Sequence, residues 1–325
     1  MPASSNQSAT TKFVLELDGV RVGLLAWAEG GEAVGDVVEV SLGGGNMQKK
    51  HVGTVRWSPI KISFGIAMGQ ALYDWIKAFL ALQAARKDGA IVAFGANGKA
   101  RWRLDWRNGQ IVEIRFPGGD GADRSEGLIT LTIQPQGTML RDAKQEPALA
   151  GLQKPKRWVR GNFRVALDNI PGDTRRILRT GDVVVRRTIT EYRDGASRFP
   201  SIILGPQKIS DWLLTLPEGQ ASEFAAWAED FLVQGHSSDA DERNGTFEYL
   251  DPAMRPLLTL SFKHLGIYRL AREPDAADKS GVTRMKAYLY CEALDLDRPA
   301  TIKSAPKRRP RKAAPKPKAR KATGR

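Results

Sequence analysis

The spacing of hydrophobic and polar residues after position 89 predicts antiparallel β-structure. Three alternating, strand-like runs are separated by Asn97-Gly98 and Asn108-Gly109, and the runs occupy 90–94, 100–106 and 110–116. An Asn-Gly pair accepts the positive φ angles of a tight hairpin turn, so these runs are expected to form a β-meander. A further alternating run at 128–133 predicts a fourth strand.

One helix is predicted ahead of this meander, at 66–86. Its apolar residues recur at helical spacing, and the members of this stripe are Leu72, Trp75, Ile76, Phe79 and Leu80. The segment Lys87-Asp88-Gly89 is expected to end the helix, because cations favour the last turn and glycine the position beyond it. The first half of the chain is therefore predicted to be β-structure, one helix and β-structure again.

Residues 157–295 repeat this order, which indicates an internal duplication. The matched segments are Phe13–Gly19 with Phe163–Asn169, Gly35–Val38 with Gly181–Val184, Trp75–Leu80 with Trp227–Leu232, and Leu104–Trp106 with Leu260–Phe262. The offset between matched segments drifts, as insertions confined to loops would cause. The alternative is two unrelated β-rich domains that share common strand patterns.

The first copy resembles the tail tube proteins of contractile phages and the tube proteins of extracellular contractile injection systems, over about 13–135. The resemblance rests on the segments Phe13–Gly19, Val38–Asn46, Lys49–Gly53, Leu72–Ile76 and Arg86–Val92. It implies small β-barrels or sandwiches, each with a flanking helix, six of which join edge to edge in a ring around a lumen. Three chains with two copies each would then form a pseudo-sixfold ring.

The expected fold class is mainly β: two tandem, similar β-barrel or sandwich domains, each with one flanking α-helix, followed by a disordered basic tail. The expected boundaries are a disordered N-terminus at 1–11, a first tube-like domain at 12–140, a linker at 141–156, a second tube-like domain at 157–296 and the tail at 297–325. No stretch is apolar enough for a membrane span, and no secretory signal is visible.

Charge changes this picture only at the C-terminus. The formal net charge is +14, but eleven Lys or Arg residues and no acidic residue lie after Arg298, which leaves +3 for the rest. These candidate contacts to nucleic acid or another acidic surface are Lys303, Lys307, Arg308, Arg309, Arg311, Lys312, Lys316, Lys318, Arg320, Lys321 and Arg325. A tail of this composition would bind DNA without sequence preference. The alternative is a solubilising or vestigial extension.

Candidate chemistry is scarce, so the chain is predicted not to be an enzyme, with no catalytic residue, no cofactor and no metal site. The three histidines lie far apart in sequence, and Cys291 is expected to be a small buried hydrophobe. Two glycine-rich segments do not have the spacing of nucleotide-binding loops. One of them belongs to a candidate assembly loop, whose residues are Gly43, Gly44, Gly45, Asn46, Lys49 and Lys50.

These observations predict a structural component of a phage tail or contractile injection tube, and within it a special ring such as an initiator, adaptor or terminator. Its expected partners are further copies of itself in a ring oligomer such as a trimer, other tail, tube or baseplate proteins, and DNA through the tail. It is expected to be made in the cytoplasm and assembled into a particle. The alternative is an oligomeric nucleic-acid-binding protein that acts through the tail.

Overall fold

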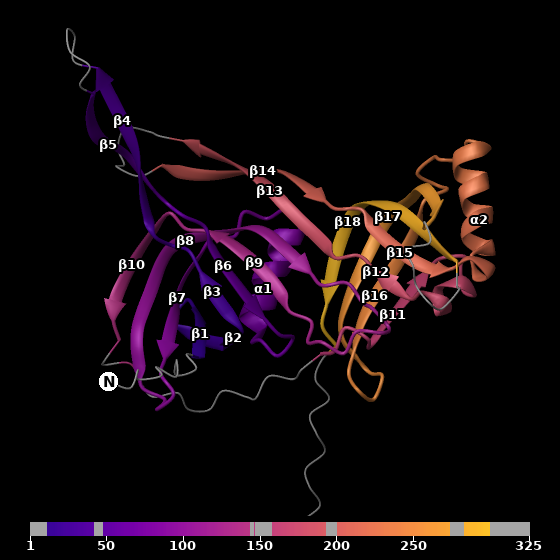
Figure 1. The fold of residues 1–325 in the computed structure, drawn as a ribbon, viewed down its shortest axis with the longest axis horizontal. Coiled ribbons are helices and arrows are strands. Elements are labelled where there is room, and N and C mark those ends of the chain that lie inside the picture. The colour runs from indigo at the N-terminus through magenta and orange to yellow at the C-terminus, as the bar shows by residue number, and fades with distance from the viewer. Residues whose placement is uncertain are drawn as a thin grey trace, which may run out of the picture.

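The computed structural model of the chain describes residues 12–41, 48–143, 146, 158–192, 200–273 and 283–299. It is built mainly of antiparallel β-strands with few helices, which confirms the predicted fold class (Figure 1). The first and second halves of the chain lie side by side, and the strands of the two halves meet at the centre of the molecule. No helix in these ranges is long and apolar enough to cross a membrane.

The first half contains one helix between its sixth and seventh strands. Its elements are β1 (Lys12–Leu17), β2 (Val20–Leu25), β3 (Trp27–Glu29), β4 (Ala33–Ser41), β5 (Gln48–Trp57), β6 (Ile60–Phe64), α1 (Gln70–Leu80), β7 (Lys87–Phe94), β8 (Ala100–Phe116), β9 (Ile129–Gln134) and β10 (Gly137–Asp142). Seven strands form a sheet in the order β2-β1-β7-β8-β9-β6-β3, and β10 pairs with β8. Strands β4 and β5 form a separate hairpin.

The second half also has its main helix after the strand that follows a hairpin, and three further strands come after this helix. Its elements are β11 (Phe163–Leu167), η1 (Asp173–Arg176), β12 (Arg179–Thr180), β13 (Val183–Tyr192), β14 (Ser201–Ile209), β15 (Trp212–Pro217), η2 (Glu218–Gln220), α2 (Ser222–Ala228), η3 (Glu229–Val233), β16 (Arg243–Leu250), β17 (Pro256–Arg272) and β18 (Arg284–Asp297). Six strands form a sheet in the order β11-β16-β17-β18-β15-β12.

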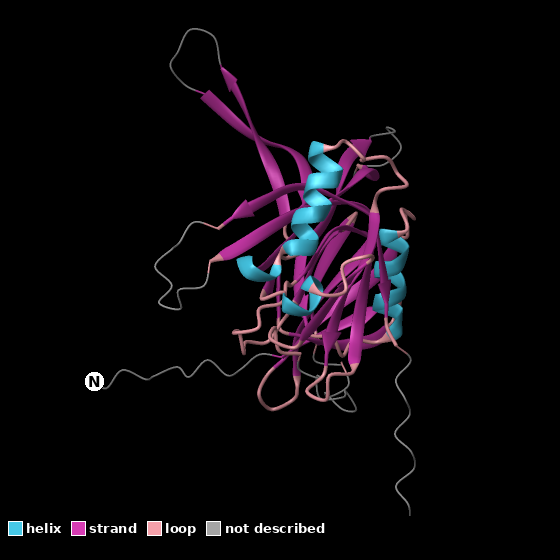
Figure 2. Ribbon diagram, turned by 90° about the vertical axis from the view of Figure 1, so that its right-hand side faces the viewer, coloured by secondary structure: helices cyan, strands magenta, loops and turns pink. Residues whose placement is uncertain are grey.

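The two halves have the same strand order. The path β1-β7-β8-β9-β6-β3 in the first half corresponds, strand by strand, to β11-β16-β17-β18-β15-β12 in the second. The hairpins β4–β5 and β13–β14 occupy the same place in this order, directly before β6 and β15. Both hairpins project from the same side of the molecule (Figure 2).

The two hairpins also share their register. Ala33 pairs with Trp57 in the first hairpin, and Val185 pairs with Ile209 in the second, so both strands are displaced by 152 positions (185 minus 33, and 209 minus 57). The register shifts between Gly35 and Val37 in β4. In β13 it shifts between Arg187 and Ile189, which are the same two positions displaced by 152. A β-bulge is a specific feature of a strand pair, so two bulges at one position indicate equivalent strands.

A second shared irregularity corrects the predicted turn at Asn108-Gly109. Strand β8 continues through this pair to Phe116, and Asn108 adopts a left-handed conformation with φ of 50° inside the strand. His264 in β17 has φ of 56°, 156 positions later. Both residues lie where the pairing with the preceding strand shifts register. Asn108-Gly109 therefore forms a bulge inside a strand and not a hairpin turn. Asn97-Gly98 lies in the expected turn between β7 and β8.

The predicted helix at 66–86 is shorter than expected. Helix α1 ends at Leu80, because Leu82 has a left-handed φ of 62° and its backbone N–H donates to the carbonyl of Phe79. Lys87, Asp88 and Gly89, expected to end the helix, belong to strand β7. The apolar stripe was identified correctly, since all five of its residues are buried.

One hydrophobic core extends through both halves and positions the two helices. It includes Trp75 of α1 and Trp227 of α2, both buried as expected for core residues, together with the inner faces of both sheets. A smaller apolar cluster lies around Val14, Val92 and Phe94. Since the larger core is continuous, the two halves share one apolar interior where they meet.

Gly89 tests the packing of the first half. A Cβ at this position would lie 2.2 Å from a ring carbon of Trp106 and 2.6 Å from the carbonyl oxygen of Glu16, so Gly89→Ala is expected to destabilise the fold by about 2 kcal/mol. Gly219→Ala is the control, because no atom lies within 4 Å of its Cβ position. Urea unfolding followed by tryptophan fluorescence measures both variants. Equal midpoints for Gly89→Ala and the control would contradict this packing.

Candidate assembly interface

The two halves are joined by an antiparallel pairing between β13 and the second part of β8. Val183, Val184, Val185 and Arg186 lie opposite Phe116, Arg115, Ile114 and Glu113. This pairing makes β13 and β14 part of the sheet of the first half, rather than of the sheet formed by the rest of the second half. One hairpin of the second half therefore belongs to the sheet of the first half, an arrangement that the sequence did not predict.

Side chains on both faces hold this pairing. Val183 and Val185 are fully buried in the shared core, so the pairing is driven by apolar burial as well as by backbone hydrogen bonds. On the other face, the Arg186 guanidinium lies 2.6 Å from the Glu113 carboxylate. A diagonal ion pair of 3.2 Å joins Arg115 to Asp182. Cross-strand charge pairs of this kind favour one register over its alternatives.

Strand β14 and the end of α1 add polar contacts to the same junction. The carbonyl oxygen of Ile202 accepts hydrogen bonds from Gln110 Nε2 at 3.1 Å and from Arg86 at 3.2 Å. The Gln207 amide donates to the carbonyl of Phe79 at 3.4 Å. The Phe79 carbonyl also accepts the Leu82 N–H, so the hairpin adds a second hydrogen bond to the last turn of α1.

The loop after β8 contacts the second half next to this pairing. Gly119 N–H donates to Thr180 Oγ1 at 2.8 Å, and the Tyr249 hydroxyl donates to the Pro117 carbonyl at 3.0 Å. Burial raises the pKa of Tyr249, which keeps it a neutral donor. The carboxylates of Asp120 and Asp123 in this loop form ion pairs with Arg179 and Arg160, respectively. Arginine side chains therefore balance the charge of these two carboxylates.

The end of β18 completes the junction by packing against α1. Arg298 donates to the Met68 carbonyl at 2.8 Å and lies over the Tyr73 ring, 4.8 Å from its centroid. Burial raises the pKa of Tyr73 to about 12, so this ring stays uncharged beside the guanidinium. Lys77 of α1 forms a 3.3 Å ion pair with Asp297. We call the contacts of β13–β14, of 117–127 and of the β18 end with their neighbours the internal junction.

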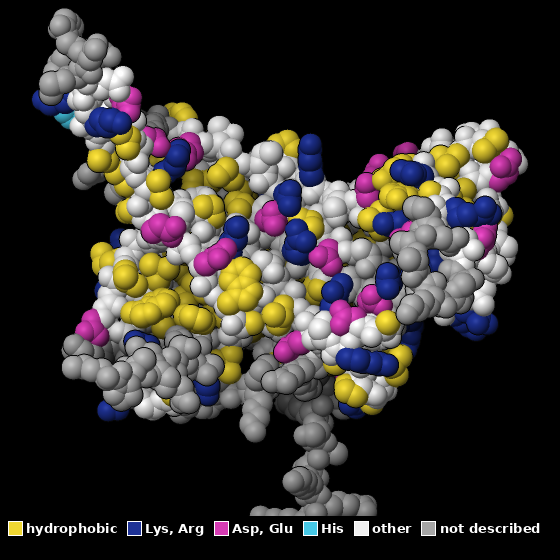
Figure 3. All heavy atoms as spheres, in the orientation of Figure 1, with side chains coloured by type: hydrophobic (Ala, Val, Ile, Leu, Met, Phe, Trp, Pro, Cys, Tyr) yellow, Lys and Arg dark blue, Asp and Glu magenta, His cyan; other side chains and the backbone are white. Residues whose placement is uncertain are grey.

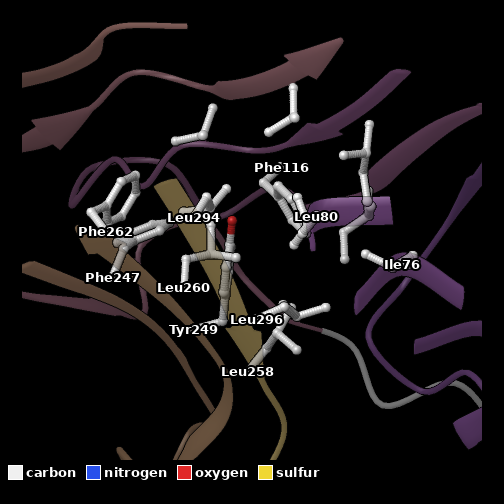
Figure 4. Close-up of a cluster of buried hydrophobic side chains, with 14 of the residues drawn as sticks. Ile76, Leu80, Phe116, Phe247, Tyr249, Leu258, Leu260, Phe262, Leu294 and Leu296 are labelled. Atoms are coloured by element: carbon white, nitrogen blue, oxygen red, sulfur yellow. The ribbon is translucent and has the colours of Figure 1, made fainter. Parts of the chain in front are cut away.

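The apolar centre of the internal junction brings together residues far apart in sequence. Figure 4 shows Ile76 and Leu80 of α1 in one cluster with Phe116 of β8 and with Leu294 and Leu296 of β18. Leu80 is 7% exposed and Leu296 is 4% exposed. Leucine side chains from both halves therefore exclude water where the halves meet, which is typical of a permanent interface.

The counterparts of these junction residues are exposed. Leu232 of η3, which occupies the position of Leu80, is 45% exposed, and Leu140, which occupies the position of Leu296, is 68% exposed. The β4–β5 hairpin, the counterpart of β13–β14, extends away from both sheets (Figure 1). Its exposed apolar residues are Val34, Val37, Val38, Val40 and Val52. Figure 3 shows hydrophobic side chains along this hairpin.

Of the predicted assembly loop, only Lys49 and Lys50 are described, and they are strand residues rather than loop residues. Both belong to β5, where they pair with Val40 and Glu39, and Lys50 Nζ lies 2.6 Å from the Glu39 carboxylate. Gly43, Gly44, Gly45 and Asn46 lie outside the described residues, as does the basic tail from Lys303 to Arg325. The interface identified here therefore consists of residues that the sequence did not single out.

The histidines lie apart from the internal junction. His51 is exposed on β5. The hydrogen bond between His236 Nδ1 and Asp230, 2.7 Å long, raises the pKa of His236. His264 Nδ1 lies 2.9 Å from Glu242, whose other oxygen accepts a hydrogen bond from the Tyr290 hydroxyl.

His264 belongs to the one described group with the geometry of a metal site. Glu242, His264 and Glu292 offer ligand atoms within 4.8 Å of one another. Sequence spacing missed this group, because two strands and a bulge bring its members together. Both oxygens of Glu242 already take part in hydrogen bonds, so the group is also explained as a polar network.

Cys291 is partly buried between neighbouring strands. Its thiol lies 3.0 Å from the Ala293 carbonyl, and burial raises the pKa of the thiol to about 11. Since the thiolate is the reactive form, this residue is poorly suited to nucleophilic chemistry at neutral pH. The expectation of a small, unreactive side chain agrees with this position, although the side chain is not fully buried.

No protein-family model and no curated protein matches this chain. Three similar solved structures are an extracellular contractile injection system PVC sheath–tube complex in the extended state (19% identity, TM-score 0.36, 40% of this chain and 88% of that chain), the PVC sheath/tube terminator in the extended state (18%, 0.36, 43% and 97%), and the anti-feeding prophage tube-terminating cap (23%, 0.37, 44% and 96%). Each of those chains is matched along most of its length by less than half of this one.

Truncating matched leucines tests the internal junction. Leu80→Ala is expected to lower the free energy of unfolding by about 2–4 kcal/mol, because it leaves a cavity between the halves. Leu232→Ala, at the equivalent exposed position, is expected to cost less than about 0.5 kcal/mol when the chain is dilute and monomeric. Chemical denaturation at low protein concentration measures both. Similar costs for the two variants would show that the junction does not depend on Leu80.

The raised pKa of the Cys291 thiol can be tested by its reaction rate. With its pKa raised to about 11, the folded protein is expected to react with a chromogenic disulfide reagent at pH 8 about 100-fold more slowly than the unfolded chain. The rate should increase about tenfold per pH unit between pH 8 and pH 10, because the thiolate fraction increases by that factor. A fast reaction at pH 7 that does not depend on pH would contradict the raised pKa.

Proposed function

We propose that this chain is a structural ring component of a contractile tail or injection particle, and that its halves are tandem copies of one tube-like domain. The observation that carries the proposal is the agreement of the halves in strand order, hairpin register and bulge positions. Unrelated β-rich domains would not be expected to share irregularities at matched positions. The segments that resemble tail tube proteins lie in the half that is taken as the first copy.

The internal junction supports a ring. It is a head-to-tail contact, in which a hairpin and a strand end of the second half meet a sheet edge and a helix of the first. A head-to-tail contact leaves one unused donor surface and one unused acceptor surface, and its repetition produces a closed ring or an open helix. Three chains with two domains each would supply the six domains of a ring with pseudo-sixfold symmetry.

The differences between the copies favour a special ring over a uniform tube. A trimer of unequal tandem domains has true threefold symmetry and only approximate sixfold symmetry. Such a ring can contact a sixfold tube and also a partner of threefold symmetry. We therefore assign the chain to an initiator, adaptor or terminator ring, with tube, tail or baseplate proteins as its partners and without a catalytic role.

Native mass spectrometry together with negative-stain electron microscopy tests this proposal. At tens of micromolar, the full chain is expected to form trimers, and the trimers to appear as rings with six lobes. The hydrophobic contacts should keep these rings intact in moderate salt. Monomers at every concentration, with no ring in the micrographs, would contradict the proposal.

The basic tail carries a second candidate function, binding of nucleic acid. Its eleven cations without any acidic residue favour sequence-independent contact with phosphates. We expect DNA affinity to fall by about 10³-fold or more between 50 and 200 mM salt, and to be lost when residues 299–325 are deleted. Fluorescence anisotropy with labelled DNA measures this, and ring formation by the shortened chain serves as the control. Unchanged DNA affinity after deletion would remove this role.

A further inference from the structure

We infer that a second copy of this chain adds its β4–β5 hairpin to the open edge of β17, at the place where β13 adds to β8 within one chain. The inference rests on the proposed ring and specifies the contact between its chains. In the first half β13 pairs with the second part of β8, whereas no described strand takes that position in the second half.

The acceptor is the second part of β17. In the second part of β8, residues 110–115 pair with β9 on one side, and residues 113–116 pair with β13 on the other. In β17, the corresponding part from Gly266 to Arg272 has β18 on one side, and no strand of the described residues pairs with its other edge. An open edge of this length presents unpaired backbone groups that can bind another strand.

The donor is the β4–β5 hairpin, and its base is held as the base of β13–β14 is held. Ser58 N–H donates to the Glu32 carbonyl at 2.9 Å, and Ser210 N–H donates to the Val184 carbonyl at 2.8 Å. The hydroxyls of both serines accept a backbone N–H at 2.9 Å near the same point. Glu32 therefore takes the place of Val184, and the hairpin leaves its domain in the same way.

Transferring the internal register gives definite pairs between chains. Val185 lies opposite Ile114 within one chain, so Ala33 is placed opposite Leu270 of the neighbouring chain, and Val34 opposite Arg269. Glu32 then lies diagonally from Arg269, in the same relation as Asp182 to Arg115. The acid remains on the donor strand and the arginine on the acceptor strand, so the charges are complementary in this register.

The contact between α1 and the end of β18 also has an equivalent between chains, in which the acidic and basic residues exchange places. The ion pair of Lys77 with Asp297 corresponds to Glu229 of one chain and Arg141 of the other. Both residues are exposed, and Arg141 also donates a hydrogen bond to Asp105 of its own chain. Leu140 and Leu232, the exposed counterparts of Leu296 and Leu80, would become buried beside this pair. A charge pair that remains complementary after both residues have changed supports a contact between chains at this position.

Cysteine crosslinking tests the pairing directly. In the full chain with Cys291→Ala, the double variant Val34→Cys and Arg269→Cys is expected to form covalent dimers and trimers under mild oxidation, visible on a non-reducing gel. Each single variant should remain free of trimers. The double variant Glu113→Cys and Arg186→Cys, at the equivalent internal pair, is the positive control and should form a bond within one chain.

The outcomes separate this inference from the proposed ring. Rings in the micrographs without crosslinked trimers would overturn the inference and leave the ring proposal standing. Monomers without crosslinks would overturn both. Crosslinked trimers, together with a control that closes within the chain, would establish β4 on β17.

A charge exchange provides an independent measurement. Glu229→Arg is expected to raise the protein concentration needed for assembly about tenfold, because it faces Arg141 with a like charge. Adding Arg141→Glu should restore assembly, whereas Lys77→Glu, its counterpart at the internal junction, should not. Thermal unfolding of each variant shows whether the monomer is intact. Assembly by Glu229→Arg at the original concentration would overturn this part of the contact.

Discussion

An open strand edge needs a partner, and this constraint determines how the two halves are joined. After Gly109, β8 no longer pairs with β7. One edge of its second part would expose its backbone if β13 did not pair with it. Valines on β13 add apolar burial, and arginine–carboxylate pairs fix the register. Because this edge is satisfied from the other half, the hairpin, the core and the helix end form one structure.

The bulges in β8 and β17 make this arrangement possible. A left-handed residue in the middle of each long strand shifts its pairing, so that the first part of the strand pairs with one neighbour and the second part becomes available to another. In the first half the second part is covered by the same chain. In the second half no strand of the described residues covers it, and this is the edge that we propose a second chain occupies.

The sequence predicted the features that depend on local chemistry. The β class, the turn at Asn97-Gly98 and the buried stripe of α1 follow from turn preferences and periodicity. The same reasoning was wrong at Asn108, because a positive φ suits a bulge as well as a turn. It also missed β13 on β8 and the group around His264, since contacts between distant segments leave no mark in spacing.

A cryo-electron microscopy map of the assembled full chain would show whether the internal junction is repeated between chains. We expect three chains in a ring, with alternating halves and with β4 of each chain paired to β17 of the next. A ring in which this hairpin contacts another surface, or in which equal halves meet each other, would contradict it.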